Sequence, residues 1–106
     1  MISLEDFQKL DIRVGEVKEA AAVPGSKNLF LLKVDLGKAE RQIVSGLAGF
    51  YRPEELLGKQ VILLANLEPR IIFGLESQGM LLAVDNGEEV ALLAPDRKVS
   101  PGSPVK

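Results

Sequence analysis

The pattern of hydrophobic and polar residues predicts a chain of short β-strands. From Leu10 to Lys18, apolar and polar residues alternate with the period of a half-buried strand, and Gly15 interrupts the row where a bulge or strong coiling is expected. Runs of apolar and β-branched residues predict the other strands at Leu29–Leu36, Arg41–Leu47, Gln60–Leu67, Met80–Val84 and the shorter Val90–Leu93.

Turn residues and two short helices separate these strands. Ser3 followed by Glu5 and Asp6 is typical of a helix start, with a capping hydroxyl and acidic residues in the first turn. The segment Pro53–Gly58 predicts a second helix of one or two turns, because proline favours the first position and glycine the stop. Turns are predicted at 23–26, 37–38 and 85–87, and the proline-rich tail 94–106 is expected to be extended.

The link from Asn66 to Gly79 is unusually long for a connection between two strands of a small domain. Such links tend to carry function. Four large apolar side chains lie close together in its middle, namely those of Ile71, Ile72, Phe73 and Leu75. We therefore expect this loop either to fold back on the core or to be covered by another chain.

The order of the elements predicts an all-β fold. Five strands with a small helix between the third and fourth are typical of the OB-fold, a five-stranded Greek-key barrel. The same pattern is compatible with another small barrel. At 106 residues the chain is expected to form one domain, residues 1–106, with one core.

Composition narrows the classes of function. The chain has no histidine and no cysteine, so it lacks the commonest general base, the commonest metal ligand and any thiol chemistry. An enzyme is therefore disfavoured, and neither a cofactor nor a metal site is expected. No apolar run approaches the roughly 20 residues needed to cross a bilayer, and the N-terminus does not resemble a signal peptide. A cytoplasmic protein without a membrane partner is the expectation.

The charge is unevenly distributed along the sequence. The formal net charge of −2 argues against a strongly basic nucleic-acid binder. However, Lys9 to Arg70 contains ten basic and eight acidic residues, and both flanks are acidic. A modest basic face on an acidic protein is compatible with this distribution.

Six motifs, in order along nearly the whole chain, resemble the tRNA-binding domain family. The family includes the C-terminal domain of many methionyl-tRNA synthetases, free-standing tRNA-binding proteins and a small chaperone-like branch. The motifs are Phe7-x-Lys9-Leu10-Asp11-Ile12-Arg13-Val14-Gly15, Val34-Asp35-Leu36-Gly37, Val44-Ser45-Gly46-Leu47, Glu55-Leu56-Leu57-Gly58-Lys59, Ala65-Asn66-Leu67-x-Pro69-Arg70 and Glu76-Ser77-Gln78-Gly79-Met80-Leu81-Leu82-Ala83.

The resemblance implies a non-catalytic OB-fold with a C-terminal extension that forms a homodimer and binds tRNA by shape. It implies a free-standing protein or the C-terminal part of a methionyl-tRNA synthetase, with a synthetase as a further partner. The starting Met1 and the lack of an N-terminal linker favour the free-standing form. Ile71, Ile72, Phe73 and Leu75 are the expected dimer interface, because a patch paired across a two-fold axis is buried twice.

The candidate RNA-binding residues are Lys33, Arg41, Asn66, Arg70, Ser77 and Met80. The cations Lys33, Arg41 and Arg70 would contact phosphates, although the first two are equally well explained as surface charges paired with Asp35 or Glu40. The resemblance favours binding for Lys33 and Arg70.

The other three candidates have alternative structural interpretations. Asn66 would read a base edge or cap a turn. Ser77 and Met80, from the S-x-G-M motif of the family, would contact RNA or serve as a strand-entry hydrogen bond and a core side chain.

The chain departs from the family in its loops. Val23 stands where many relatives have a histidine, and Glu68, Ile71 and Phe73 stand where many have basic residues. Losing these cations weakens the phosphate-neutralising contribution to RNA affinity. The departure favours the alternative function, a chaperone-like module that binds proteins or peptides.

Overall fold

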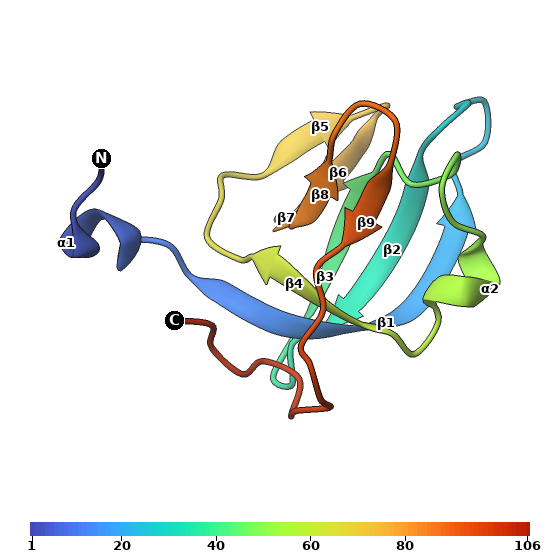
Figure 1. Cartoon of the computed structure of the whole chain (residues 1–106). Helices are drawn as coiled ribbons and strands as arrows, with labels where there is room; N and C mark the ends of the chain where they lie inside the picture. Colours follow the sequence, from blue (N-terminus) through green and yellow to red (C-terminus); the bar gives the residue numbers. More distant parts are fainter.

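The computed structural model describes all 106 residues and has a five-stranded antiparallel barrel at its centre (Figure 1). The strands of this sheet follow the order β3-β2-β1-β4-β7, and smaller hairpins and two helices surround it. The elements are α1 (Leu4–Phe7), β1 (Ile12–Ala22), β2 (Phe30–Asp35), β3 (Glu40–Ser45), α2 (Pro53–Leu56), β4 (Gln60–Leu64), β5 (Arg70–Ile72), β6 (Leu75–Ser77), β7 (Met80–Leu81), β8 (Ala83–Asp85) and β9 (Val90–Leu92). The prediction of an OB-like barrel is confirmed.

The long strand β1 holds the sheet together by pairing with both of its neighbours. Its first half pairs with β4, from Ile12 opposite Leu64 to Glu16 opposite Gln60. The rest pairs with β2, and a bulge between Val17 and Glu19 lets the strand curl. Gly15 is needed for another reason: a Cβ atom there would overlap Val34 on the neighbouring strand. The predicted irregularity is therefore real, but the bulge lies a few residues beyond the glycine.

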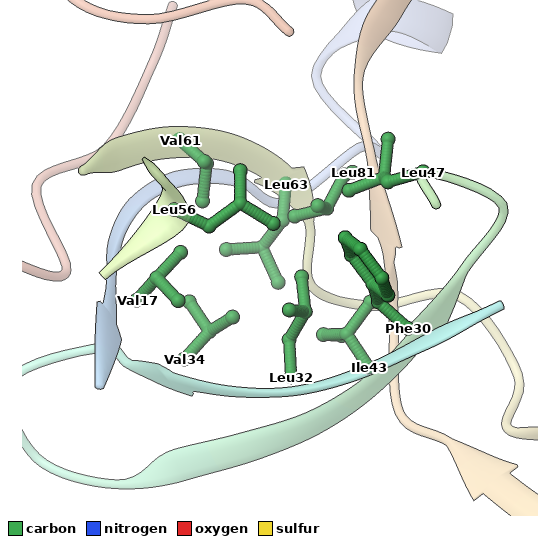
Figure 2. Close-up of a cluster of buried hydrophobic side chains, with 10 residues drawn as sticks. All are labelled: Val17, Phe30, Leu32, Val34, Ile43, Leu47, Leu56, Val61, Leu63 and Leu81. Atoms are coloured by element: carbon green, nitrogen blue, oxygen red, sulfur yellow. The ribbon is translucent and has the colours of Figure 1, made fainter. Parts of the chain in front are cut away.

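The core fills the inside of the barrel with side chains from every strand of the sheet (Figure 2). The alternation of β2 explains its share, since Phe30, Leu32 and Val34 are buried while Lys33 between them is exposed. Leu56 of α2 is fully buried and closes one side of this cluster. The cluster consists of Val17, Phe30, Leu32, Val34, Ile43, Leu47, Leu56, Val61, Leu63 and Leu81.

The long link between the fourth and fifth predicted strands is a β-hairpin. Strands β5 and β6 pair from Arg70 opposite Ser77 to Ile72 opposite Leu75, and Phe73 and Gly74 make the turn. Both turn residues have positive φ, 54° for Phe73 and 78° for Gly74, as a tight two-residue hairpin turn requires. Phenylalanine is a poor residue for that backbone conformation, which is why the sequence did not signal the hairpin.

The predicted strand Met80–Val84 is divided between two sheets. β7 continues the barrel by pairing with the end of β4, whereas β8 turns away and pairs with β9. The predicted turn at 85–87 joins β8 to β9, and the N–H of Gly87 donates to the side chain of Asp85.

The C-terminal tail lies along the first half of β1, at the edge of the strand opposite the one that pairs with β4. The N–H groups of Gly102 and Val105 donate to the carbonyls of Val14 and Ile12 at 2.7 and 2.8 Å. The Gln60 side chain fixes the tail further by bonding both the N–H and the carbonyl of Val99. By contrast, α1 stands away from the barrel and has no buried residue (Figure 1). Neither helix has the length or apolar character that crossing a bilayer requires.

Candidate nucleic-acid interface

Four of the six candidate residues surround the point where β3, β4 and β7 meet. Arg41 is the second residue of β3 and reaches across to the backbone of the other segments, where its Nη1 donates to the carbonyls of Ala65 at 2.7 Å and Gln78 at 3.0 Å. It forms no ion pair with an acidic side chain. Arg41 therefore has a fixed guanidinium group whose charge is not neutralised by a carboxylate.

Asn66 follows directly after this junction and holds the N-terminal segment in place. Its Oδ1 accepts from the N–H of Asp11 at 2.8 Å, and its Nδ2 donates to the carbonyl of Lys9 at 2.8 Å. Both polar ends of the amide are thus engaged with backbone, although the side chain is exposed. The geometry favours the structural interpretation of this residue, as a cap that bridges two segments.

Ser77 closes the barrel with its side chain. Only 1% of its surface is exposed, and its Oγ accepts from the N–H of Val44 at 3.0 Å and donates to the carbonyl of Gly79 at 3.2 Å. Gln78 acts in the same way, because its Oε1 accepts from the N–H of Gln42 at 2.9 Å. The polar atoms that sequence analysis assigned to RNA contact at Ser77 are used within the protein.

The closure by Gln42 and Gln78 is a feature that sequence reasoning missed. Besides the contacts above, the Nε2 of Gln42 donates to the carbonyl of Glu76 at 2.8 Å. The sequence around Gln42 and Gln78 predicts solvent-exposed side chains and gives no indication of such a contact. Between them, Gln42, Ser77 and Gln78 join β3 to β6, where no regular strand pairing is present.

Gly79 and Met80 complete the S-x-G-M motif. Gly79 has φ of 143°, and a Cβ there would lie 2.9 Å from the carbonyl oxygen of Leu64, so the residue must be glycine for the chain to approach β4. Met80 pairs with Leu64 and stays exposed. Its thioether is accessible to a ligand at the same end of the barrel as Arg41 and Asn66.

Lys33 and Arg70 lie apart from this group. Lys33 projects from the middle of β2, opposite Gln42, and its Nζ lies 3.4 Å from Glu19. Arg70 begins the β5–β6 hairpin, is exposed and has no acidic partner. Between them along the surface lie β3 and β6, so roughly three strand spacings, about 14 Å, separate the two backbones. That span suits contact with different phosphates of one RNA.

The shifted pKa values lie outside this group of residues. A hydrogen bond from Lys18 lowers the pKa of the Glu16 carboxyl, and the same bond raises the pKa of Lys18. A hydrogen bond from the Arg52 side chain lowers the pKa of Glu55 at the start of α2. These are surface ion pairs, which contribute little to the stability of a fold. No three acidic side chains converge to hold a metal ion.

Comparison with known proteins agrees with this architecture. Residues 12–104 match the family described as "Putative tRNA binding domain". The chain is 54% identical over 105 residues to a methionine–tRNA ligase of Pyrococcus horikoshii, covering 99% of this chain and 14% of the ligase.

Two crystal structures superpose on the whole chain. A MetRS related protein from Pyrococcus horikoshii has a TM-score of 0.94 at 38% identity, with 100% of this chain and 98% of that chain covered. The chaperone CsaA from Bacillus anthracis has a TM-score of 0.91 at 29% identity, with 100% and 99% covered. The chain thus spans about one seventh of the length of the ligase it matches and nearly all of these two smaller proteins. It belongs to the tRNA-binding domain family.

Proposed function

We propose that this chain is a non-catalytic tRNA-binding module that works as a homodimer and raises the RNA affinity of a methionyl-tRNA synthetase, either as a free-standing protein or as part of the enzyme. The observation that carries the proposal is the match of residues 12–104 to the family. The high identity to a methionine–tRNA ligase supports the association with that enzyme. The proposed site of action is the cytoplasm.

The proposed RNA contacts divide into direct and supporting residues. Lys33, Arg70 and Met80 are exposed and would touch the RNA, the two cations at phosphates and the thioether at a base or ribose. Arg41, Asn66 and Ser77 shape the surface through their bonds to backbone, and Arg41 retains free N–H donors. Recognition of this kind reads the shape and charge of a structured RNA more than its sequence.

Homodimerisation would place two copies of this weakly basic surface on one RNA, which raises apparent affinity without a new kind of contact. The predicted interface is the β5–β6 hairpin. Its exposed members are Ile71 at 71% and Phe73 at 58%, whereas Ile72 and Leu75 are half-buried. Burying these side chains between two copies would remove an apolar patch from water.

The backbone of Phe73 supports a contact role for the hairpin tip. Phenylalanine is held at φ of 54°, a conformation that favours glycine or asparagine, and most of its surface is exposed. A strained, exposed aromatic side chain is typical of a residue kept for binding.

The second candidate function is the binding of unfolded protein segments. The exposed Ile71 and Phe73 and the superposition on the chaperone CsaA favour it. The net charge of −2 also limits RNA affinity.

Titration of the protein with tRNA and with an unfolded polypeptide, each at low and high salt, separates the two functions. Electrostatic binding of tRNA weakens steeply with added salt, whereas apolar peptide binding does not. Salt-sensitive tRNA binding supports the module proposed here. Salt-insensitive binding of the polypeptide, without tRNA binding, would transfer the assignment to the chaperone-like function.

A further inference from the structure

A cation-lined cleft opens beside the candidate interface, between the start of β1, the β2–β3 turn and the C-terminal tail. Its volume is about 380 Å³. Three cations line it, Arg13, Lys38 and Arg41, against a single carboxylate, that of Asp11. The local charge balance is therefore +2 on a protein whose net charge is −2.

The two guanidinium groups are held in place by the fold. Arg13 donates from Nε to Asp11 at 2.6 Å and from Nη1 to the carbonyl of Gly102 at 3.0 Å. Arg41 is fixed through Nη1 to Ala65 and Gln78. Each arginine keeps its Nη2 donors free, and a ligand need not order these side chains on binding.

Lys38 adds a cation that makes no ion pair. It is exposed in the turn between β2 and β3, and this turn is held by a bond from the N–H of Leu36 to the carbonyl of Ala39 at 2.8 Å. The tail fixes the opposite wall, because the N–H of Gly102 donates to Val14. Asp35 and Glu40 flank the turn but do not line the cleft, and Asp35 accepts from the N–H of Gly37.

We infer that this cleft binds a backbone phosphate of the RNA, held by Arg13, Lys38 and Arg41. Fixed guanidinium groups with free N–H donors match the oxygens of a phosphodiester, and the lysine adds a point charge. Arg41 lines the cleft and also bonds the carbonyls of Ala65, next to Asn66, and of Gln78, two residues before Met80. A strand bound in the cleft would therefore continue onto the proposed interface. The inference rests on the proposed tRNA-binding function and extends its surface to two residues outside the predicted contacts, Arg13 and Lys38.

The test compares Lys38→Ala with Lys27→Ala. Both lysines are exposed, neither forms an ion pair, and they lie in the connections at opposite ends of β2. Binding of labelled tRNA is measured by fluorescence anisotropy from about 0.1 M to about 1 M salt. The salt slope is the change in the logarithm of the binding constant with the logarithm of salt concentration. Loss of one phosphate contact should reduce the size of this slope by about one. The affinity lost by the variant, relative to the unchanged protein, should therefore be about five- to eightfold greater at 0.1 M salt than at 1 M.

Lys38→Ala is expected to show this loss, Lys38→Arg to retain affinity, and Lys27→Ala to change affinity less than about twofold. The Nε–Hε NMR signals of Arg13 and Arg41 in the unchanged protein should also shift when tRNA is added. Equal effects of Lys38→Ala and Lys27→Ala, with unmoved arginine signals, would refute phosphate binding in the cleft and leave the proposed function intact. Absence of tRNA binding by the unchanged protein would overturn both.

Discussion

The hydroxyl group of Ser77 accepts a 3.0 Å hydrogen bond from the backbone N–H of Val44, and this side chain takes the place of a strand carbonyl in closing the barrel. Such a bond is buried, since only 1% of Ser77 is exposed. The S-x-G-M motif of this chain therefore has a structural role, in addition to any role of Met80 in binding.

Ser77→Ala should lower the free energy of unfolding by about 1–3 kcal/mol, because it leaves the N–H of Val44 buried without a partner. Chemical denaturation measures this loss. Ser45→Ala is the matched control: Ser45 lies on the same strand as Val44, its hydroxyl makes no hydrogen bond, and its change should stay within about 0.5 kcal/mol. If Ser77→Ala is as stable as the control but loses tRNA affinity, the hydroxyl acts on RNA instead.

Phe73→Asn should raise the free energy of unfolding by about 0.5–1 kcal/mol, since asparagine tolerates positive φ far better than phenylalanine. The same substitution should weaken whichever contact the hairpin tip makes. Ile71→Asn removes a neighbouring exposed apolar side chain from a regular strand position and should not stabilise the fold. The Phe73 ring lies beside Gly25 of the 23–26 turn. A destabilised Phe73→Asn variant would show that this contact outweighs the backbone strain.

Phe73→Glu should convert the proposed dimer into a monomer of 11.5 kDa in analytical ultracentrifugation, because each copy would bring an unpaired charge into the proposed interface. The unchanged protein should sediment near twice that mass at micromolar concentration. A monomeric unchanged protein would refute the dimer.

The N-terminal segment provides a control for the assignment of the dimer interface to the β5–β6 hairpin. It exposes Met1, Ile2, Leu4 and Leu10, and only Phe7 of α1 packs against the apolar cluster at the start of β1. Leu4→Glu should leave the dimer intact if the hairpin is the interface. The opposite pattern, a dimeric Phe73→Glu and a monomeric Leu4→Glu, would place the interface on the N-terminal segment.

The barrel was predictable from the sequence because its signals are local. Alternation along β1, the turn residues and the proline-led helix α2 follow from residues close together in the chain. The β5–β6 hairpin was not, because Phe73 occupies a turn position that glycine or asparagine normally signals.

The roles of the candidate site residues depended on contacts between distant segments. Asn66 bonds the backbone at Asp11, 55 residues earlier, and Arg41 bonds carbonyls 24 and 37 residues later. No local sequence pattern indicates partners this far away in the chain. The resemblance identified the residues, and only the fold separated exposed candidates such as Arg70 from those whose polar atoms are already engaged.

The most direct test of the account is the salt dependence of tRNA binding by the unchanged protein and by the double variant Lys33→Ala, Arg70→Ala, with Lys27→Ala as a control. We predict that the logarithm of the binding constant falls linearly with the logarithm of salt concentration, and that the double variant lowers this slope by about two while the control leaves it unchanged. Equal slopes for all three proteins, with the fold intact by circular dichroism, or no binding of tRNA at all, would contradict it.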